Sequence, residues 1–289
     1  PLFRSDSVIM KRFFYFIALL VAIAFTSCSN EANDLSTLSK DDMAAIENVK
    51  SELSVLNTNY QKPQTRMAKW LRWLIFGAAD AAGAIWGGGV GGACTASTLA
   101  WTVTKEETKA IESRAVQKVA PILKVDNLDG IEEGSAGYIH NTVISSAFAN
   151  NEDLCSKSNN EVMNIILDEM EKQTGTIFTE NQKKNIISYT NTIIDSFDSN
   201  KTVEEYYEDL KNKATDAKQK EALNICGIVL DGLQYVDDND CSYAEAAKNI
   251  IKKSSIEPNL KATLLDGVSV ANASAKLWNT DALVDETLK

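Results

Sequence analysis

The sequence predicts an all-α protein, a multi-helix bundle with a Gly/Ala-rich helical hairpin in its N-terminal part. Three observations lead to this fold class. Only four prolines occur among 289 residues. Apolar residues recur at helical spacing almost everywhere after residue 40, and the capping pattern [ST]-x-x-[EQ] occurs repeatedly in the C-terminal half. No stretch of strand length alternates between polar and apolar residues, so we expect helices throughout.

The first element is a secretory signal peptide. From Met10, the basic residues Lys11 and Arg12 precede an apolar run from Phe13 to Phe25. Such a run spans roughly 20 Å as a helix, against about 30 Å for the hydrocarbon core of a bilayer. A cleaved signal is therefore favoured over a permanent transmembrane anchor, and residues 1–9 are expected to precede the natural start.

The end of this signal resembles the bacterial lipobox. Thr26, Ser27 and Cys28 stand where lipoproteins have small residues before the lipid-bearing cysteine. The resemblance implies that Cys28 is the acylated first residue of the mature chain and that the lipid holds the protein at a membrane. Phe25 replaces the usual leucine, which leaves cleavage by an ordinary signal peptidase open. Ser29 is not the aspartate of inner-membrane retention signals, so we expect an outer-membrane lipoprotein, facing either the periplasm or the cell surface.

The charge distribution divides the mature chain. Residues 126–289 contain 15 basic and 29 acidic residues, and this acidic half repels nucleic acid. Nucleic acid is therefore not an expected partner. Four segments are predicted: upstream residues and signal peptide (1–27), an acidic tether (28–38), N-terminal helices with the Gly-rich hairpin (39–134) and an acidic helical bundle (135–289).

The first helix of the mature chain is expected to begin at Ser39, whose spacing to Asp42 suits an N-cap. Residues at helical spacing then form one apolar side: Met43, Ile46, Val49, Leu53 and Leu56.

The next element runs from Gly77 to Trp101 and contains seven glycines and a single charge, Asp80. Gly83, Gly87 and Gly91 would form a side-chain-free stripe on a continuous helix, where another helix could approach closely. Five of the six residues from Gly87 to Gly92 are glycine, however, and each costs about 1 kcal/mol relative to alanine in a helix. We therefore expect the chain to turn at GGGVGG and form a helical hairpin with a tip of small residues.

Three roles remain open for this hairpin. It packs inside a stable fold, it inserts into a membrane, or it docks onto a helix of a protein partner through Gly83, Gly87 and Gly91. The membrane-active reading rests on 24 uncharged residues, 81–104, which reach about 36 Å as a helix. In composition the segment resembles the hydrophobic hairpin of pore-forming colicins and some Gly-rich bacteriocins. Seventeen of the 24 residues are Gly, Ala, Ser or Thr, which gain little from lipid, so packing is favoured.

The acidic half is expected to be helical from end to end. Ser135 opens a short helix, and a buried helix spans Leu223 to Leu233 because it is apolar nearly all round. A last helix follows Pro258. Capping boxes are predicted at Thr179 with Gln182, Thr202 with Glu205, and Ser242 with Glu245.

His140 is the only histidine, in the sequence AGYIHNTV, and no nucleophile or carboxylate adjacent to it indicates catalysis. A packing or helix-start role is favoured, and a hydrolase using His140 is the distant alternative. The phrase GYIHN, with SVANASAKLW near the C-terminus, resembles helical bacterial lipoproteins of unassigned function.

Neither a cofactor nor a metal is predicted. The loop around Asn127 and Asp129 departs from a calcium loop at its first and last ligand positions, and the Asp237–Asp240 region suits a solvated turn. Besides Cys28 there are four cysteines, which an oxidising periplasm could pair in three ways: Cys94, Cys155, Cys226 and Cys241.

These patterns together predict a membrane-anchored, non-enzymatic lipoprotein that acts as a binding or structural component of the cell envelope. The alternative from another class is a membrane-permeabilising toxin that uses the hairpin.

Overall fold

The computed structural model of the chain describes residues 38–60, 67–86, 89–107, 130–151, 153–197, 201–233, 235 and 242–278. Within these ranges the regular structure is entirely helical, which confirms the all-α prediction. The α-helices are α2 (Lys40–Tyr60), α3 (Met67–Trp86), α4 (Val90–Glu107), α6 (Ala136–Asn150), α7 (Asn159–Thr174), α8 (Glu180–Ile194), α9 (Val203–Lys213), α10 (Ala217–Leu233), α11 (Ser242–Lys253) and α12 (Pro258–Trp278).

Local capping chemistry explains most helix starts. Ser39 accepts a hydrogen bond from the backbone N–H of Asp42 at 3.0 Å, as predicted for α2. Ser135 caps α6, and the two boxes that begin at Thr179 and Thr202 are complete in both directions.

Two helix starts differ from the prediction. Ser158 and Glu161 form a complete capping box at the start of α7, which was not predicted although the two residues have the required spacing. Ser242 is the first residue of α11 rather than a cap before it, and its hydroxyl forms a hydrogen bond with the Tyr60 hydroxyl. The hydroxyl thus joins α11 to α2.

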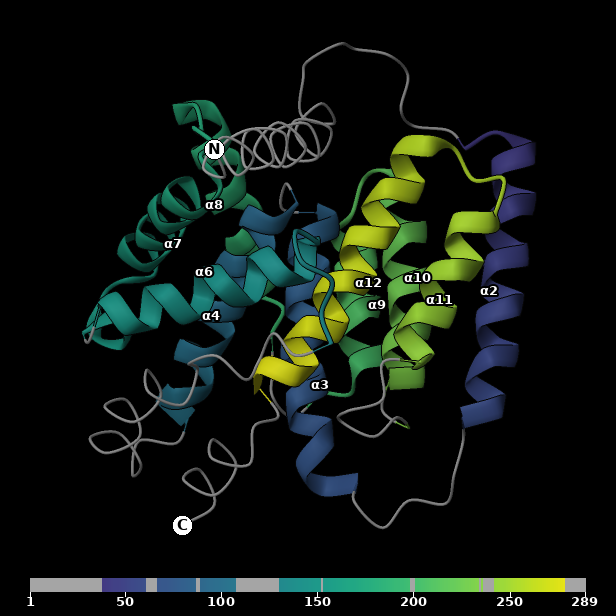
Figure 1. The fold of residues 1–289 in the computed structure, drawn as a ribbon, viewed down its shortest axis with the longest axis horizontal. Coiled ribbons are helices and arrows are strands. Elements are labelled where there is room, and N and C mark those ends of the chain that lie inside the picture. Colours follow the sequence, from purple (N-terminus) through teal and green to yellow (C-terminus); the bar gives the residue numbers. More distant parts are fainter. Residues whose placement is uncertain are drawn as a thin grey trace, which may run out of the picture.

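The hairpin of α3 and α4 lies at the centre of the bundle (Figure 1). Helix α12 packs along α3, while α7 and α8 pack on α4 and α10 packs on α3. Helix α2 lies at one edge beside α10 and α11, and α6 crosses both α12 and α4. One hydrophobic core therefore includes residues from α2 through α12, and helices from both halves of the chain contribute to it.

The turn of the hairpin is tighter than predicted. Helix α4 begins at Val90, so Gly91 and Gly92 are helical and do not belong to the turn. Gly89 has φ 77°, a left-handed conformation that favours glycine, and its N–H donates to the Ala84 carbonyl at 3.1 Å. The backbone of Gly92 lies where a Cβ atom at Gly83 of α3 would stand, whereas a Cβ atom at Gly91 would meet side chains at ordinary contact distances.

One core prediction is wrong. Met43 is 54% exposed, whereas Ala45 and Asn57 are buried beside Ile46, Val49 and Leu53. The buried side of α2 is thus rotated slightly from the predicted one. Asn57 is satisfied there, because its amide nitrogen donates to the Ile228 carbonyl at 2.8 Å.

No helix in the described part of the chain has both the length and the apolar character that crossing a membrane requires.

Candidate functional site

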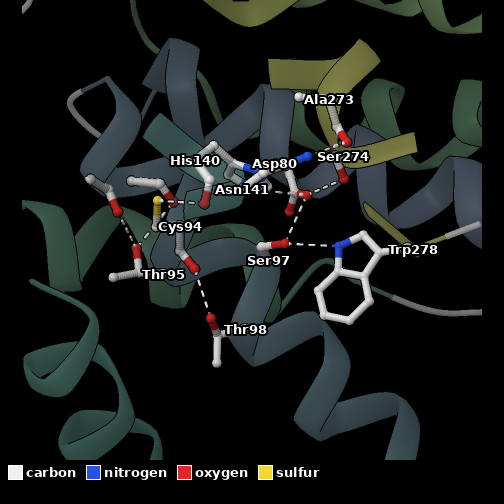
Figure 2. A network of polar contacts seen from close by, with 12 residues as sticks. Asp80, Cys94, Thr95, Ser97, Thr98, His140, Asn141, Ala273, Ser274 and Trp278 are labelled. Atoms are coloured by element: carbon white, nitrogen blue, oxygen red, sulfur yellow. Dashed lines mark hydrogen bonds and ion pairs between the residues drawn. The ribbon is translucent and has the colours of Figure 1, made fainter. Parts of the chain in front are cut away.

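A network of buried polar side chains lies where α3, α4, α6 and α12 meet (Figure 2). Asp80 is at its centre and is fully buried, as are the four side chains that contact or support it: Ser97, His140, Asn141 and Ser274. A buried carboxylate needs partners that replace its water, since desolvation of an ion costs several kcal/mol. The network supplies these partners from three other helices.

A glycine allows α3 and α4 to pack closely beside this network. Gly83 lies on α3 one turn after Asp80, and a Cβ atom there would overlap the backbone of Gly92 and Ala93 on α4. The two helices can therefore approach closely only because position 83 is glycine. This contact brings Ser97 of α4 within reach of Asp80.

Two serine hydroxyls bind the same oxygen of Asp80. Ser97 donates to Oδ2 at 2.8 Å, and Ser274 of α12 donates to Oδ2 through a short hydrogen bond. The indole N–H of Trp278 donates to the Ser97 hydroxyl oxygen at 3.0 Å. Helix α12 thus holds the carboxylate both directly and through Ser97.

His140 contributes from α6, with its Nε2 atom 3.4 Å from Asp80 Oδ2. Its Nδ1 atom lies 2.8 Å from the Asn141 side-chain oxygen, and the Asn141 amide donates to the Ala273 carbonyl at 3.0 Å. Neither Asp80 Oδ1 nor His140 Nε2 has a hydrogen bond among the described residues, so the approach of Nε2 to Oδ2 is close but lacks hydrogen-bond alignment.

The network contributes more to the choice of one helix arrangement than to net stability, because its hydrogen bonds replace hydrogen bonds to water. Removal of one partner is much more costly, because it leaves a buried polar group without compensation.

Further polar groups of α4 surround the network. The Cys94 thiol lies 3.9 Å from the His140 carbonyl oxygen, and burial, together with the Asp80 carboxylate, raises its pKa well above the ordinary value. The Thr95 hydroxyl contacts the Thr190 hydroxyl of α8 at 2.8 Å, and Thr98 donates to the Cys94 carbonyl. A protonated thiol in this setting is a packing group and not a nucleophile.

The arrangement differs from that of a hydrolytic triad. A serine nucleophile has to donate to the histidine that accepts its proton. Here both serines donate to the carboxylate instead, and the whole group is shielded from solvent. His140 is the fifth residue of α6, and its side chain is buried in the core.

The three glycines proposed as a contact stripe do not share one helix. Gly83 lies at the crossing of α3 and α4, whereas Gly91 on α4 faces the side chains of Ile186, Leu167 and Met170 at ordinary contact distances. Gly87 is outside the described residues. The two glycines that can be placed thus meet helices of the same chain.

Several predicted positions fall outside the described part of the chain: Cys28 with the signal and tether, Asn127, Asp129, Cys241 and the Asp237–Asp240 turn. Cys94 and Cys226 are free and buried. No group of His, Cys, Asp and Glu side chains suited to a metal ion occurs among the residues whose positions are described.

Sequence reasoning identified Asp80 as an isolated charge and His140 as an isolated histidine but did not connect them. Their isolation was the available clue, since a charge inside an apolar stretch needs a buried partner of opposite charge. No sequence pattern indicated that the other members of the network take part in it: Ser97, Ser274 and Trp278.

No known protein family, curated protein or solved structure matches this chain.

Proposed function

We propose that the chain is an outer-membrane lipoprotein, anchored through Cys28, whose helical bundle is a non-enzymatic binding or structural component of the cell envelope. The sequence Thr26-Ser27-Cys28 after a short apolar run supports the anchor. The central polar network supports a role without catalysis, because its hydroxyls, carboxylate and imidazole interact with one another in the core.

Metabolic labelling with a fatty-acid probe tests the anchor. The wild-type protein should incorporate the probe, Cys28→Ser should not, and Cys241→Ser serves as the matched control that keeps the lipobox cysteine. Equal labelling of all three proteins would contradict the proposal. A Ser29→Asp variant should move from the outer to the inner membrane on fractionation.

A membrane-permeabilising toxin is the second candidate, and one observation favours it. The described residues from Gly77 to Ala100, which contain a single charge, Asp80, are buried beneath the other helices and stay covered until the bundle opens. The helices that pack on the hairpin, α6, α7, α8, α9, α10 and α12, would have to separate from it before it could reach lipid.

Dye release from liposomes, measured together with thermal melting, separates the two candidates. For residues 29–289 the lipoprotein proposal expects no release by the wild type, and a marked drop in the melting temperature for Gly83→Leu. Strong release by the wild type, together with unshifted melting of Gly83→Leu, would support the toxin and contradict a packed hairpin.

A further inference from the structure

Five helices have one terminus at the same end of the bundle. Helices α9 and α11 end there, whereas α2, α10 and α12 begin there, and Figure 1 shows the start of α2 beside the connection from α11 to α12. The Lys218 side chain of α10 and Glu257, the residue before α12, form an ion pair at 3.2 Å, which joins two of these termini. We call residues 38–43, 213–220 and 252–261 the lysine end.

The lysine end is basic, whereas the whole chain has a net charge of −11. It contains four acidic residues and seven lysines, a formal excess of three positive charges: Asp41, Asp42, Asp216 and Glu257 against Lys40, Lys213, Lys218, Lys220, Lys252, Lys253 and Lys261.

Three of these lysines have contacts within the fold. Besides the ion pair of Lys218, the Lys213 side chain donates to the Ser196 hydroxyl at 2.6 Å. Lys261 donates to the Ser254 carbonyl at 2.6 Å and so helps to close the end of α11. These lysines therefore have a structural explanation.

The other four lysines are exposed: Lys40, Lys220, Lys252 and Lys253. Lys252 and Lys253 close α11, where a positive charge suits the helix dipole. Lys220, in contrast, lies in the first turn of α10, where the dipole favours an acidic residue. The helices themselves therefore explain only part of the cluster, and the remaining charge suits an anionic ligand outside the chain.

One apolar side chain is exposed in the same region. Met43 is 54% exposed and lies one turn after Lys40 on α2. Apolar side chains next to lysines are typical of surfaces that bind a bilayer, because the apolar group enters the boundary between headgroups and acyl chains while the lysines attract anionic headgroups. The chemistry of the lysine end thus fits an anionic lipid surface.

The segment that leads from the lipid-bearing cysteine also reaches the bundle at this end. Residues 28–38 connect Cys28 to the start of α2, and at full stretch they span at most about 35 to 40 Å. Tyr60, at the other end of α2, lies about 30 Å farther along the helix axis. The lysine end is therefore the part of the bundle nearest to the lipid along the chain.

We propose that the lysine end lies against the anionic headgroups of the membrane that holds Cys28, with Met43 at the headgroup boundary. This inference rests on the lipid anchor proposed above. At physiological ionic strength the screening length is about 8 Å, so charges on the rest of the bundle contribute little at the membrane surface. The local excess of lysines therefore sets the orientation, and each exposed lysine that reaches the headgroups strengthens the contact by about fivefold.

The reactivity of the lysines tests this orientation. The mature chain, carrying Cys155→Ser and Cys241→Ser, is coupled through Cys28 to a maleimide lipid, and its two remaining thiols are buried. The vesicles contain either phosphatidylcholine alone or equal parts of phosphatidylcholine and phosphatidylglycerol. A water-soluble amine reagent then modifies the accessible lysines, and mass spectrometry measures the modification of each one.

Phosphatidylglycerol should lower the modification of the four exposed lysines by about threefold or more relative to phosphatidylcholine alone, and about 1 M salt should abolish the difference. Lys157, just before α7, and Lys172, near its end, are internal controls, because Figure 1 shows α7 on the opposite side of the molecule from α2 and α11. Both controls should react equally on the two kinds of vesicle. Equal modification of the four lysines on both vesicles, or equal protection of all six, overturns the proposal.

Two matched double variants separate local charge from overall charge. Lys252→Gln/Lys253→Gln removes two charges from the lysine end, and Lys157→Gln/Lys172→Gln removes two charges elsewhere. Only the first variant should lose most of the protection of Lys40 and Lys220, and equal losses in the two variants overturn the proposal.

The anchor and the orientation can fail separately, because coupling to the maleimide lipid does not depend on acylation in the cell. Protection of the lysine end in a chain that incorporates no fatty-acid probe would contradict the anchor and support the lipid-binding surface. Incorporation of the probe without protection of the lysine end would support the anchor and overturn the orientation.

Discussion

Gly83 sets the distance between the two central helices. A Cβ atom at this position would overlap the Gly92 carbonyl, which is backbone and cannot move aside without shifting α4. Gly77, on the same helix, has only ordinary contacts with Ala271 and Leu230 around the place of a Cβ atom. These two glycines therefore form a matched pair for substitution.

We expect Gly83→Ala to lower the free energy of unfolding by about 1 to 3 kcal/mol, because it overpacks a backbone contact. Gly77→Ala should leave it unchanged or raise it by up to about 1 kcal/mol, since alanine favours the helix. Urea unfolding of both variants measures the difference. Equal effects would show that α3 and α4 do not approach closely at Gly83.

Asp266 on α12 is a carboxylate whose burial raises its pKa to about 6. The ordinary value is about 3.9, so the unfolded chain ionises at lower pH than the folded one. Ionised Asp266 therefore destabilises the fold, and this loss develops as the pH rises from about 4 through about 6.

Asp266→Asn should stabilise the protein at pH 7 by about 1 to 3 kcal/mol and should make little difference below about pH 4. Glu52→Gln, at an exposed position in the middle of α2, is the control and should show no such dependence on pH. Melting temperatures of both variants and the wild type, measured at pH 7 and below about pH 4, test this prediction. A gain that is the same at both would indicate a cause other than the buried charge.

At the scale of single elements, helix starts followed from sequence because capping is local. The boxes at Thr179 and Thr202 depend on residues three positions apart, and both form as predicted. The start of α11 differs, because Ser242 is its first residue and its hydroxyl forms a tertiary hydrogen bond with Tyr60. Such a contact with a residue distant in sequence is not visible in a local pattern.

Helix α9 allows a direct test of such a cap. It has 11 residues and buries Tyr206, Tyr207 and Leu210, and the Tyr207 hydroxyl donates to the Ala78 carbonyl of α3 at 2.9 Å. Thr202→Ala should lower the free energy of unfolding by about 1 kcal/mol, whereas Thr202→Ser should retain most of the capping energy. Chemical denaturation of the two variants distinguishes them, and indistinguishable losses would mean that the hydroxyl has no capping role.

At the scale of the whole molecule, the position of the hairpin could not be predicted. Sequence indicated two helices with small residues and a tight turn, but not that other helices would surround them. Likewise, 60 positions separate Asp80 from His140, and no periodic pattern relates residues on different helices. These features depend on how helices pack, which is decided by the sum of many tertiary contacts.

The single hydrophobic core leads to a prediction about cooperativity. Since α3 from the N-terminal part packs along α12 at the other end of the chain, neither half can bury its apolar residues alone. Unfolding by urea should therefore give one transition, with far-UV and near-UV circular dichroism changing together. Two separated transitions would indicate that residues 39–134 and 135–289 are independent units.

The reaction rates of two buried thiols can show whether the helical bundle opens in part before it unfolds. Cys94 lies in the central hairpin, and Cys226 lies in α10, where burial raises its pKa to about 12. In a chain whose other three cysteines are replaced by serine, a thiol reagent can modify each only after its surroundings open. Faster modification of Cys94 than of Cys226 would mean that the hairpin leaves the bundle while the rest stays folded. Equal rates would mean that the centre is exposed only when the whole protein unfolds.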